Sequence, residues 1–334
     1  MKTLPVCLFE DREECALGVK FLVLSAQKHE PEWLFHAFVR NFSQEDLTWL
    51  ASQPNVNLRV EVPTNQKGWN VKPSLLRQLL LETDGPVLWC DSDIILASPV
   101  SGILNSIDEA VFVATEEYGW GLNKGSRLRV AGWNLEEARP LVSTVNSCFM
   151  RMSPCHLPLL NAWDTALACP VYGQAQSRTW DQRPLHLMSD QDVLTALLAS
   201  SEHAQIPLFL LRSGKDIAQC FEEDGYTVQD RLINFFFQRV PQLVHAQGGK
   251  PWKNGVRASY QQLSTYSPIA LPYAKQWSLP RKWAHPDNFL FRLVNIVTFN
   301  EPNLRGIFPA SFRTLQRCWK HRNEIVNYLK RGKL

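Results

Sequence analysis

Two carboxylates follow a short apolar run in the segment VLWCDSDIIL, residues 87–96. Asp91 and Asp93 are one residue apart, and they come where a buried strand would end. In an extended chain, side chains with this spacing point to the same side. Like charges beside a core need a cation, and a hard divalent metal shared with substrate phosphates meets that need. The segment therefore predicts a metal–diphosphate site, although acids at such a place also serve as turn residues or helix caps.

A second cluster of chemically capable residues lies far downstream, in LVHAQGGKPW, residues 243–252. A neutral imidazole such as that of His245 ligates divalent metals. Gly248 and Gly249 would let backbone N–H groups approach phosphate oxygens, and Lys250 would add a positive charge. A single histidine beside a strand is also common as a structural residue. The combination of residue types within one short segment favours a phosphate and metal site.

The elements that would position these two segments alternate between strands and helices. Helix 72–82 has a proline in its first turn, and helix 189–200 begins with a serine that can cap it. This alternation predicts an α/β protein with a doubly wound, mostly parallel sheet flanked by helices, which binds ligands at the carboxyl ends of its strands. The predicted strands are 19–26, 57–62, 87–96, 110–115, 146–152 and 206–211, and the predicted helices are 31–42, 72–82 and 189–200.

Composition limits the classes of function. The chain has 334 residues, 45% of them hydrophobic and 20% charged, which suits one large domain with a C-terminal extension. The net charge of +3 does not suggest a nucleic-acid partner. The 12 tryptophans and 17 phenylalanines either stack on sugars or fill cores.

The N-terminus and the cysteines indicate where in the cell the protein is expected. No run of about 18 apolar residues would span a membrane, and the acidic cluster DREE comes too early for a signal peptide. The eight cysteines form no Cys-x-x-Cys pair, so we expect neither a zinc ribbon nor a thioredoxin motif, and we expect a reducing cytosolic setting. Residues 312–334 read as a basic amphipathic helix, which either packs on the protein or contacts an anionic membrane surface.

The two motifs together resemble those of the GT-A glycosyltransferases, in particular the retaining family 8 group that includes glycogenin and bacterial lipopolysaccharide galactosyltransferases. That group carries an Asp-x-Asp motif and a late His-x-x-Gly-x-x-Lys-Pro-Trp motif. The resemblance implies a GT-A-type fold in residues 1–252, followed by an α-rich C-terminal extension, 253–334. It implies that Asp91, Asp93 and His245 hold Mn²⁺ or Mg²⁺, which bridges the phosphates of a UDP-sugar, with Gly248 and Lys250 at the diphosphate.

Segments between the two motifs fit the same group. Asn146-Ser147 resembles a segment that lines the sugar pocket, and Asp190-Gln191-Asp192 resembles a motif at the donor sugar and the reacting carbon. Leu24, Ser25 and Ala26 would contact uracil and ribose. The donor-binding residues implied in addition are Lys72, Ser92, Asn146, Ser147 and Gly249.

The chain also departs from the pattern of the group. His245 and Lys250 are one position closer together than in the group's motif, and Cys148 stands where a glycine usually follows Asn-Ser. Residues after 253 match nothing in the group, so the acceptor does not carry over.

The expected activity is metal-dependent transfer of a hexose from a UDP-sugar to a hydroxyl group, with retention of configuration. The acceptor would be a glycan, a lipid-linked saccharide, a protein or a small molecule. Gln191 and Asp192 are the candidates near the anomeric carbon. Were the enzyme inverting, Glu116 or Glu117 could act as general base, although both also read as solvated loop acids.

Two other classes of function compete with this one. Haloacid dehalogenase-type phosphoryl-transfer enzymes also use Asp-x-Asp after an apolar strand, but on the first strand and without a Lys-Pro-Trp motif. A GT-A-like domain could instead bind a sugar nucleotide or glycan without turnover. The full set of Asp91, Asp93 and His245 argues against that alternative.

Overall fold

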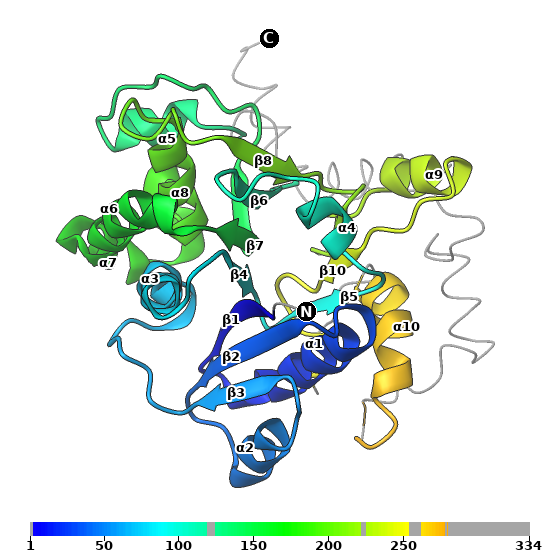
Figure 1. The fold of residues 1–334 in the computed structure, drawn as a ribbon. Helices are drawn as coiled ribbons and strands as arrows, with labels where there is room; N and C mark the ends of the chain where they lie inside the picture. Colours follow the sequence, from blue (N-terminus) through cyan, green and yellow to red (C-terminus); the bar gives the residue numbers. More distant parts are fainter. Residues whose placement is uncertain (1–2, 119–123, 222–224, 254–261, 278, 280–334) are drawn as a thin grey trace, which may run out of the picture.

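A seven-stranded sheet forms the centre of the molecule (Figure 1). The computed structural model describes residues 3–118, 124–221, 225–253, 262–277 and 279. Only β7 runs antiparallel to its neighbours, and the other pairings in this sheet are parallel. In sheet order the strands are β3 (Val56–Arg59), β2 (Trp33–Val39), β1 (Leu4–Glu10), β4 (Val87–Cys90), β7 (Val145–Met152), β6 (Phe112–Glu116) and β8 (Leu208–Leu211). The predicted mostly parallel α/β fold is confirmed.

A small second sheet lies beside the first and has the strand order β5-β10-β9. Its strands are β5 (Ile94–Leu96), β10 (Leu243–His245) and β9 (Ile217–Gln219). β10 pairs antiparallel with β5, so that His245 lies opposite Ile94. This pairing brings the late motif of the chain to the Asp-x-Asp segment.

Helices cover both faces of the large sheet. Leu75, Leu79, Trp163 and Leu194, from three helices, pack on one face, and residues of α1 such as Val19 and Leu22 pack on the other. The helices are α1 (Ala16–His29), α2 (Gln44–Ala51), α3 (Lys72–Glu82), α4 (Ser101–Leu104), α5 (Arg127–Gly132), α6 (Leu157–Ala168), α7 (Pro170–Gln176), α8 (Asp190–Ala199), α9 (Val228–Phe236) and α10 (Ser267–Ala270).

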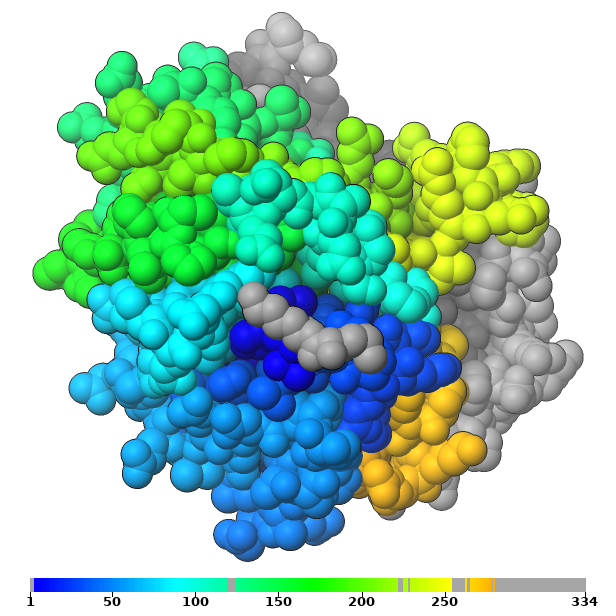
Figure 2. All heavy atoms as spheres, viewed as in Figure 1, coloured from blue at the N-terminus to red at the C-terminus, as the bar shows by residue number. Residues whose placement is uncertain are grey.

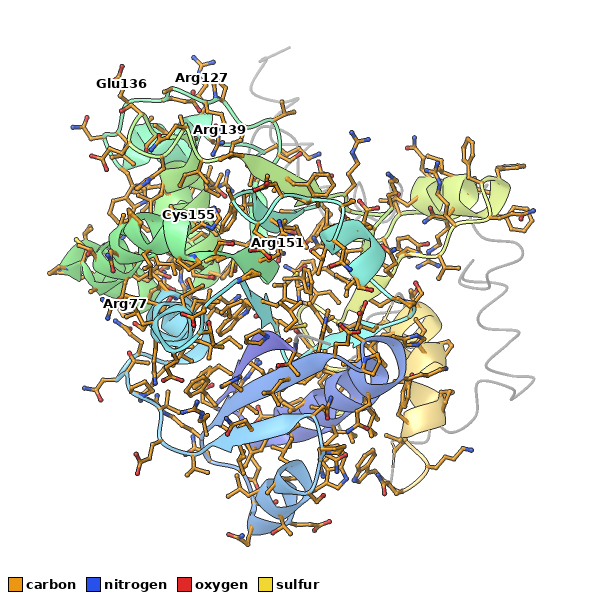
Figure 3. All side chains as sticks on the ribbon, viewed as in Figure 1. Arg77, Arg127, Glu136, Arg139, Arg151 and Cys155 are labelled. Atoms are coloured by element: carbon orange, nitrogen blue, oxygen red, sulfur yellow. The ribbon has the colours of Figure 1, made fainter. Side chains whose placement is uncertain are left out.

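One buried cation fastens a connection to this sheet. Arg151 of β7 donates hydrogen bonds to the carbonyl oxygens of Leu104 and Ile107, at 2.7 and 3.0 Å (Figure 3). Backbone carbonyls at the end of a helix lack partners within that helix. Arg151 therefore fixes the segment after α4 against the sheet.

Two predicted elements near the N-terminus are wrong. Residues 19–26 belong to α1 and not to a strand, and β1 comes earlier, at Leu4–Glu10. Residues 31–42 contain β2 and not a helix. α1 is apolar around most of its circumference, so it lacks the polar stripe that marks a surface helix. The predicted helices at 72–82 and 189–200 and the strands at 57–62, 110–115, 146–152 and 206–211 are confirmed to within a few residues.

Part of the predicted C-terminal extension is described. Residues 262–277 pack against α1 and the small sheet, where Tyr266 and Ala270 contribute to a core with Phe21, Ile95 and Trp252. The predicted helix at 312–334 lies outside the described residues, and the boundary at residue 252 stays a prediction. Within the described part of the chain, no helix is long and apolar enough to cross a membrane.

Helix α9 stands at the edge of the molecule, drawn in yellow in Figure 2. Phe235, Phe236 and Phe237 are 71%, 75% and 64% exposed at its C-terminal end. A Thr227–Asp230 capping box fixes its N-terminal end.

Candidate active site

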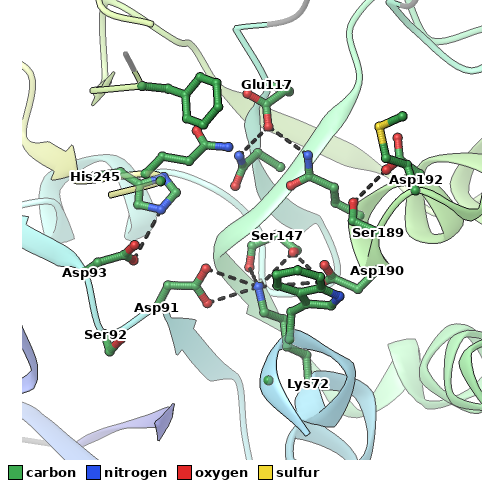
Figure 4. Close-up of a pocket in the computed structure, with 18 of the residues that line it drawn as sticks. Lys72, Asp91, Ser92, Asp93, Glu117, Ser147, Ser189, Asp190, Asp192 and His245 are labelled. Carbon is green, nitrogen blue, oxygen red and sulfur yellow. Dashed lines mark hydrogen bonds and ion pairs between the residues drawn. The ribbon is translucent and has the colours of Figure 1, made fainter. Parts of the chain in front are cut away.

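The Asp-x-Asp segment forms a turn between β4 and β5. Asp91 and Asp93 were expected on one extended strand, but the chain leaves the large sheet after Cys90 and enters the small sheet at Ile94. The N–H of Ile94 donates to the carbonyl oxygen of Asp91 at 3.1 Å and closes the turn. Both carboxylates still line one cleft (Figure 4).

His245 reaches the turn through the pairing of β10 with β5. Its Nε2 lies 3.3 Å from Oδ1 of Asp93, and the ammonium of Lys250 binds the other carboxylate oxygen. The N–H of Ala246 donates to the backbone oxygen of Asp93 at 2.9 Å. Burial would raise the pKa of Asp93, but Lys250 and His245 hold it well below its usual range. Asp93 is therefore an ionised, fixed carboxylate.

The three predicted metal ligands come together. One oxygen of Asp91, one oxygen of Asp93 and one ring nitrogen of His245 all lie within 4.8 Å of one another. Ligand atoms about 2.0–2.6 Å from a divalent cation are at most about 5 Å apart. Two carboxylates and an imidazole suit such a cation. The residues present therefore fit a divalent metal.

Lys72 stands at the opposite side of Asp91. Its ammonium lies 3.0 Å from a carboxylate oxygen of Asp91 and 3.7 Å from Oδ2 of Asp190, and it donates to Oγ of Ser147 at 2.9 Å. Burial lowers the pKa of Lys72, but Asp190 and Asp91 raise it above its ordinary value overall. One buried cation thus joins the Asp-x-Asp turn to β7 and α8 (Figure 4).

Helix α8 presents its N-terminal residues Asp190, Gln191 and Asp192 to the cleft. Asp192 accepts hydrogen bonds from Nε of Arg129 at 2.7 Å and from Oγ of Ser189 at 2.6 Å. Burial raises the pKa of Asp190 and of Asp192, although Lys72 and Arg129 oppose this effect. Both acids are held rigidly by buried partners.

Glu117 belongs to the cleft, and reading it as a solvated loop acid was wrong. It is 8% exposed, and its Oε2 accepts hydrogen bonds from Gln191 at 2.8 Å and from Asn146 at 2.6 Å. Among the described residues, no lysine, arginine or histidine lies within ion-pair distance of Glu117. Burial raises its pKa, while the two amide donors lower it. Glu116 bonds to Ser143 and does not line the cleft.

The end of β1 supplies residues that sequence reasoning missed. Glu10 accepts from Nε of Arg12 at 2.7 Å and also bonds to Ser92, and all three line the cleft. Leu24, Ser25 and Ala26 were expected at this place. They lie on α1 and do not line the cleft, and Ser25 instead donates to the carbonyl of Leu22 and accepts from the N–H of Leu96. Reading residues 4–10 as the first strand would have found Glu10 and Arg12.

The glycines and the tryptophan of the late motif have separate roles. Gly248 lines the cleft with a φ of +82°, a conformation that favours glycine, whereas Gly249 is exposed and does not line it. Trp252 is buried and lies so close to Gly18 that an added Cβ would come within 2.6 Å of its ring. The motif therefore anchors itself on α1 while it presents His245 and Lys250.

The cleft has a volume of about 760 Å³. Its polar end holds the Asp-x-Asp turn, His245 and the start of α8, and its other walls carry aromatic residues. Of the acids that line it, Glu10, Asp91, Asp93, Asp190 and Asp192 each lie within 4 Å of a cation. The predicted residues that line it are Lys72, Asp91, Ser92, Asp93, Asn146, Ser147, Asp190, Gln191, Asp192, His245, Gly248 and Lys250.

No family model and no curated protein sequence matches the chain. Similar solved structures include the bifunctional glycosyltransferase WbbM, which is 12% identical, with a TM-score of 0.49. The match covers 82% of this chain and only 52% of the WbbM chain. The galactosyltransferase LgtC, solved with donor and acceptor sugar analogs, is 12% identical, with a TM-score of 0.48 over 84% of this chain and 99% of that one. GlyE of Streptococcus pneumoniae TIGR4 is 10% identical, with a TM-score of 0.47 over 86% and 63%. These are glycosyltransferases, the class that the motifs resemble, but at such identities the case for a function rests on the residues of the cleft.

Proposed function

We propose that this protein is a metal-dependent glycosyltransferase that moves a hexose from a UDP-sugar to a hydroxyl group, with retention of configuration. The observation that carries the proposal is the convergence of Asp91, Asp93 and His245 at one end of a deep cleft. The first residues of α8 line the same cleft, which supports the proposal of transfer from a bound diphosphate.

Transfer of a sugar from a UDP-sugar requires that the negative charge of the leaving diphosphate be neutralised. The bond between the anomeric carbon and the diphosphate breaks, and negative charge develops on the leaving oxygen. Mn²⁺ or Mg²⁺, when bound by Asp91, Asp93 and His245, would supply positive charge at this place. Lys72 and Lys250 hold the two acids in place by ion pairs, and Gly248 leaves room for phosphate oxygens close to the backbone.

The sugar would lie between β7 and α8. Asn146 and Ser147 of β7 and Asp190 of α8 supply polar groups for its hydroxyls. By the resemblance of its motif, Gln191 would stand at the reacting carbon, and a hydrogen bond to Glu117 orients its amide. The acceptor oxygen bonds to the anomeric carbon on the face that the diphosphate leaves, and the hydroxyl proton passes to the departing phosphate oxygen.

The setting proposed is the reducing cytosol, supported by the described cysteines, all of which are free. Peripheral contact with a membrane through the basic stretch 312–334 remains part of the proposal. The proposal does not include a nucleic-acid partner.

The experiment is calorimetric titration of UDP with and without Mn²⁺, followed by a panel of UDP-hexoses and assay of their hydrolysis. We expect UDP to bind only with the metal, and one UDP-hexose to be turned over. Absence of UDP binding in both conditions would refute the donor assignment. Tight UDP-hexose binding without any turnover would favour a non-catalytic binding protein.

A further inference from the structure

Two exposed tryptophans stand edge to face at the wall of the cleft. Trp69 is 43% exposed and Trp180 is 54% exposed, and both line the cleft. Their ring centroids are 6.5 Å apart with an interplanar angle of 83°. Large indole rings that stay open to water at a cleft wall, and not in a core, mark a place where a ligand is bound.

Both rings are held by their neighbours. The segment of Trp69 is tied down on two sides, because the N–H of Gly68 donates to Asp11 at 2.9 Å and Asn70 accepts from the hydroxyl of Tyr172 at 2.8 Å. Behind Trp180, the guanidinium of Arg183 lies 5.4 Å from the ring centroid. A surface that is fixed before binding loses little entropy when a ligand arrives.

The position of Trp180 connects the pair to the reacting end of the cleft. Leu185 and Met188 also line the cleft, and Met188 directly precedes the serine before α8. An apolar wall therefore runs from Trp180 to Gln191. Trp69 is tied instead to the end of β1, on the side where the cleft offers Glu10 and Arg12.

We infer that Trp69 and Trp180 form the acceptor subsite and that the acceptor is a saccharide, which stacks the C–H face of a sugar ring on one indole and contacts the other. A sugar ring has one face of C–H bonds and a rim of hydroxyls, which suits an aromatic wall beside polar groups. This inference rests on the proposed function, because it shares the cleft. It narrows the acceptor class from any hydroxyl compound to a glycan, free or linked to a carrier.

The test measures binding of lactose, maltose and cellobiose by saturation-transfer NMR, beside calorimetry of UDP with Mn²⁺. We expect at least one disaccharide to bind, with saturation strongest on its axial C–H groups. The variant W180A should weaken that binding by about tenfold, W180F should keep most of it, and UDP affinity should not change. W69A should also weaken disaccharide binding.

Phe236→Ala is the matched control, since it removes an exposed aromatic ring away from the cleft. It should leave both affinities unchanged. Loss of UDP binding in W180A with disaccharide binding intact would assign the ring to the nucleobase and overturn the inference. So would the absence of binding by all three disaccharides. Trp180-dependent disaccharide binding without UDP binding would support the inference while refuting the proposed donor.

Discussion

The ammonium group of Lys72 lies 3.0 Å from a carboxylate oxygen of Asp91, so the first acid of the turn is paired with a buried cation. The same ammonium stands 3.7 Å from Asp190 on α8. One cation therefore balances the charge of two acids from distant parts of the chain and fixes the position of the Asp-x-Asp turn relative to α8.

Replacing Lys72 with methionine should leave Asp91 and Asp190 without their cation. Breaking a buried ion pair by removing one partner costs about 3–5 kcal/mol. We expect a loss of that order in the free energy of unfolding, measured by urea denaturation. Lys215→Met is the matched control, because Lys215 is half exposed where it pairs with Asp216 and such pairs contribute about 0–1 kcal/mol. Equal losses in the two variants would contradict the proposed role.

Removing His245 should weaken metal binding and spare the fold. We expect His245→Ala to lower the affinity for Mn²⁺ by at least about tenfold, because it takes away the nitrogen ligand. Electron paramagnetic resonance of free Mn²⁺ gives the binding curve. His203→Ala, at another buried histidine that does not line the cleft, should leave the curve unchanged. Unaltered Mn²⁺ affinity in His245→Ala would exclude this residue as a ligand.

Glu117 should make the stability of the protein depend on pH. Burial raises its pKa in the folded state, so the folded protein takes up this proton more readily than the unfolded chain. The contribution is therefore favourable at low pH and is lost as pH rises through the folded-state pKa. Glu117→Gln should therefore gain stability relative to the wild type as the pH rises above the ordinary glutamate pKa of about 4.3. Urea denaturation across this range measures the difference.

Glu45→Gln, at an exposed glutamate of α2, supplies the control for this pH series. Its stability relative to the wild type should change little across the range. A Glu117→Gln curve parallel to the wild type would show that burial does not shift the titration of this carboxyl.

A methyl group on Gly18 should disturb the proposed metal site through Trp252 and Ser92, which lie next to Gly18. A Cβ there would come within 2.6 Å of the Trp252 ring and 2.8 Å of the backbone oxygen of Ser92. Overpacking of this kind costs about 1–3 kcal/mol, and the turn that holds Asp91 and Asp93 would have to move. We expect Gly18→Ala to be destabilised and to bind Mn²⁺ more weakly. Gly102→Ala, where a Cβ meets nothing within 4 Å, should retain both properties.

Local signals in the sequence predicted the elements that carry them. The proline at the start of α3 and the serine before α8 mark helix starts, and both helices are found there. The Asp-x-Asp and His-x-x-Gly motifs are also local, and they supply the three residues that could hold a metal ion. α1 and β2 carry no such signal, because each is buried on most sides and shows an apolar run without a clear period.

Contacts between distant residues could not be predicted in the same way. The position of Glu117 beside Gln191 depends on the pairing of β6 with β7 and the packing of α8 on them. The pair of Arg129 with Asp192 depends on the approach of α5 to α8. Neither pair is encoded by spacing along the chain, since both arise from the register and packing of the folded molecule.

The pairing of β5 with β10 joins residues that are synthesised at different times. A ribosome releases the chain from its N-terminus, so the turn with Asp91 and Asp93 emerges well before His245 and Lys250. All the strands of the large sheet precede residue 212, and β10 is not one of them. A nascent chain can therefore expose every strand of the large sheet while Asp93 still lacks both partners, and the proposed metal site is complete only when β10 pairs with β5.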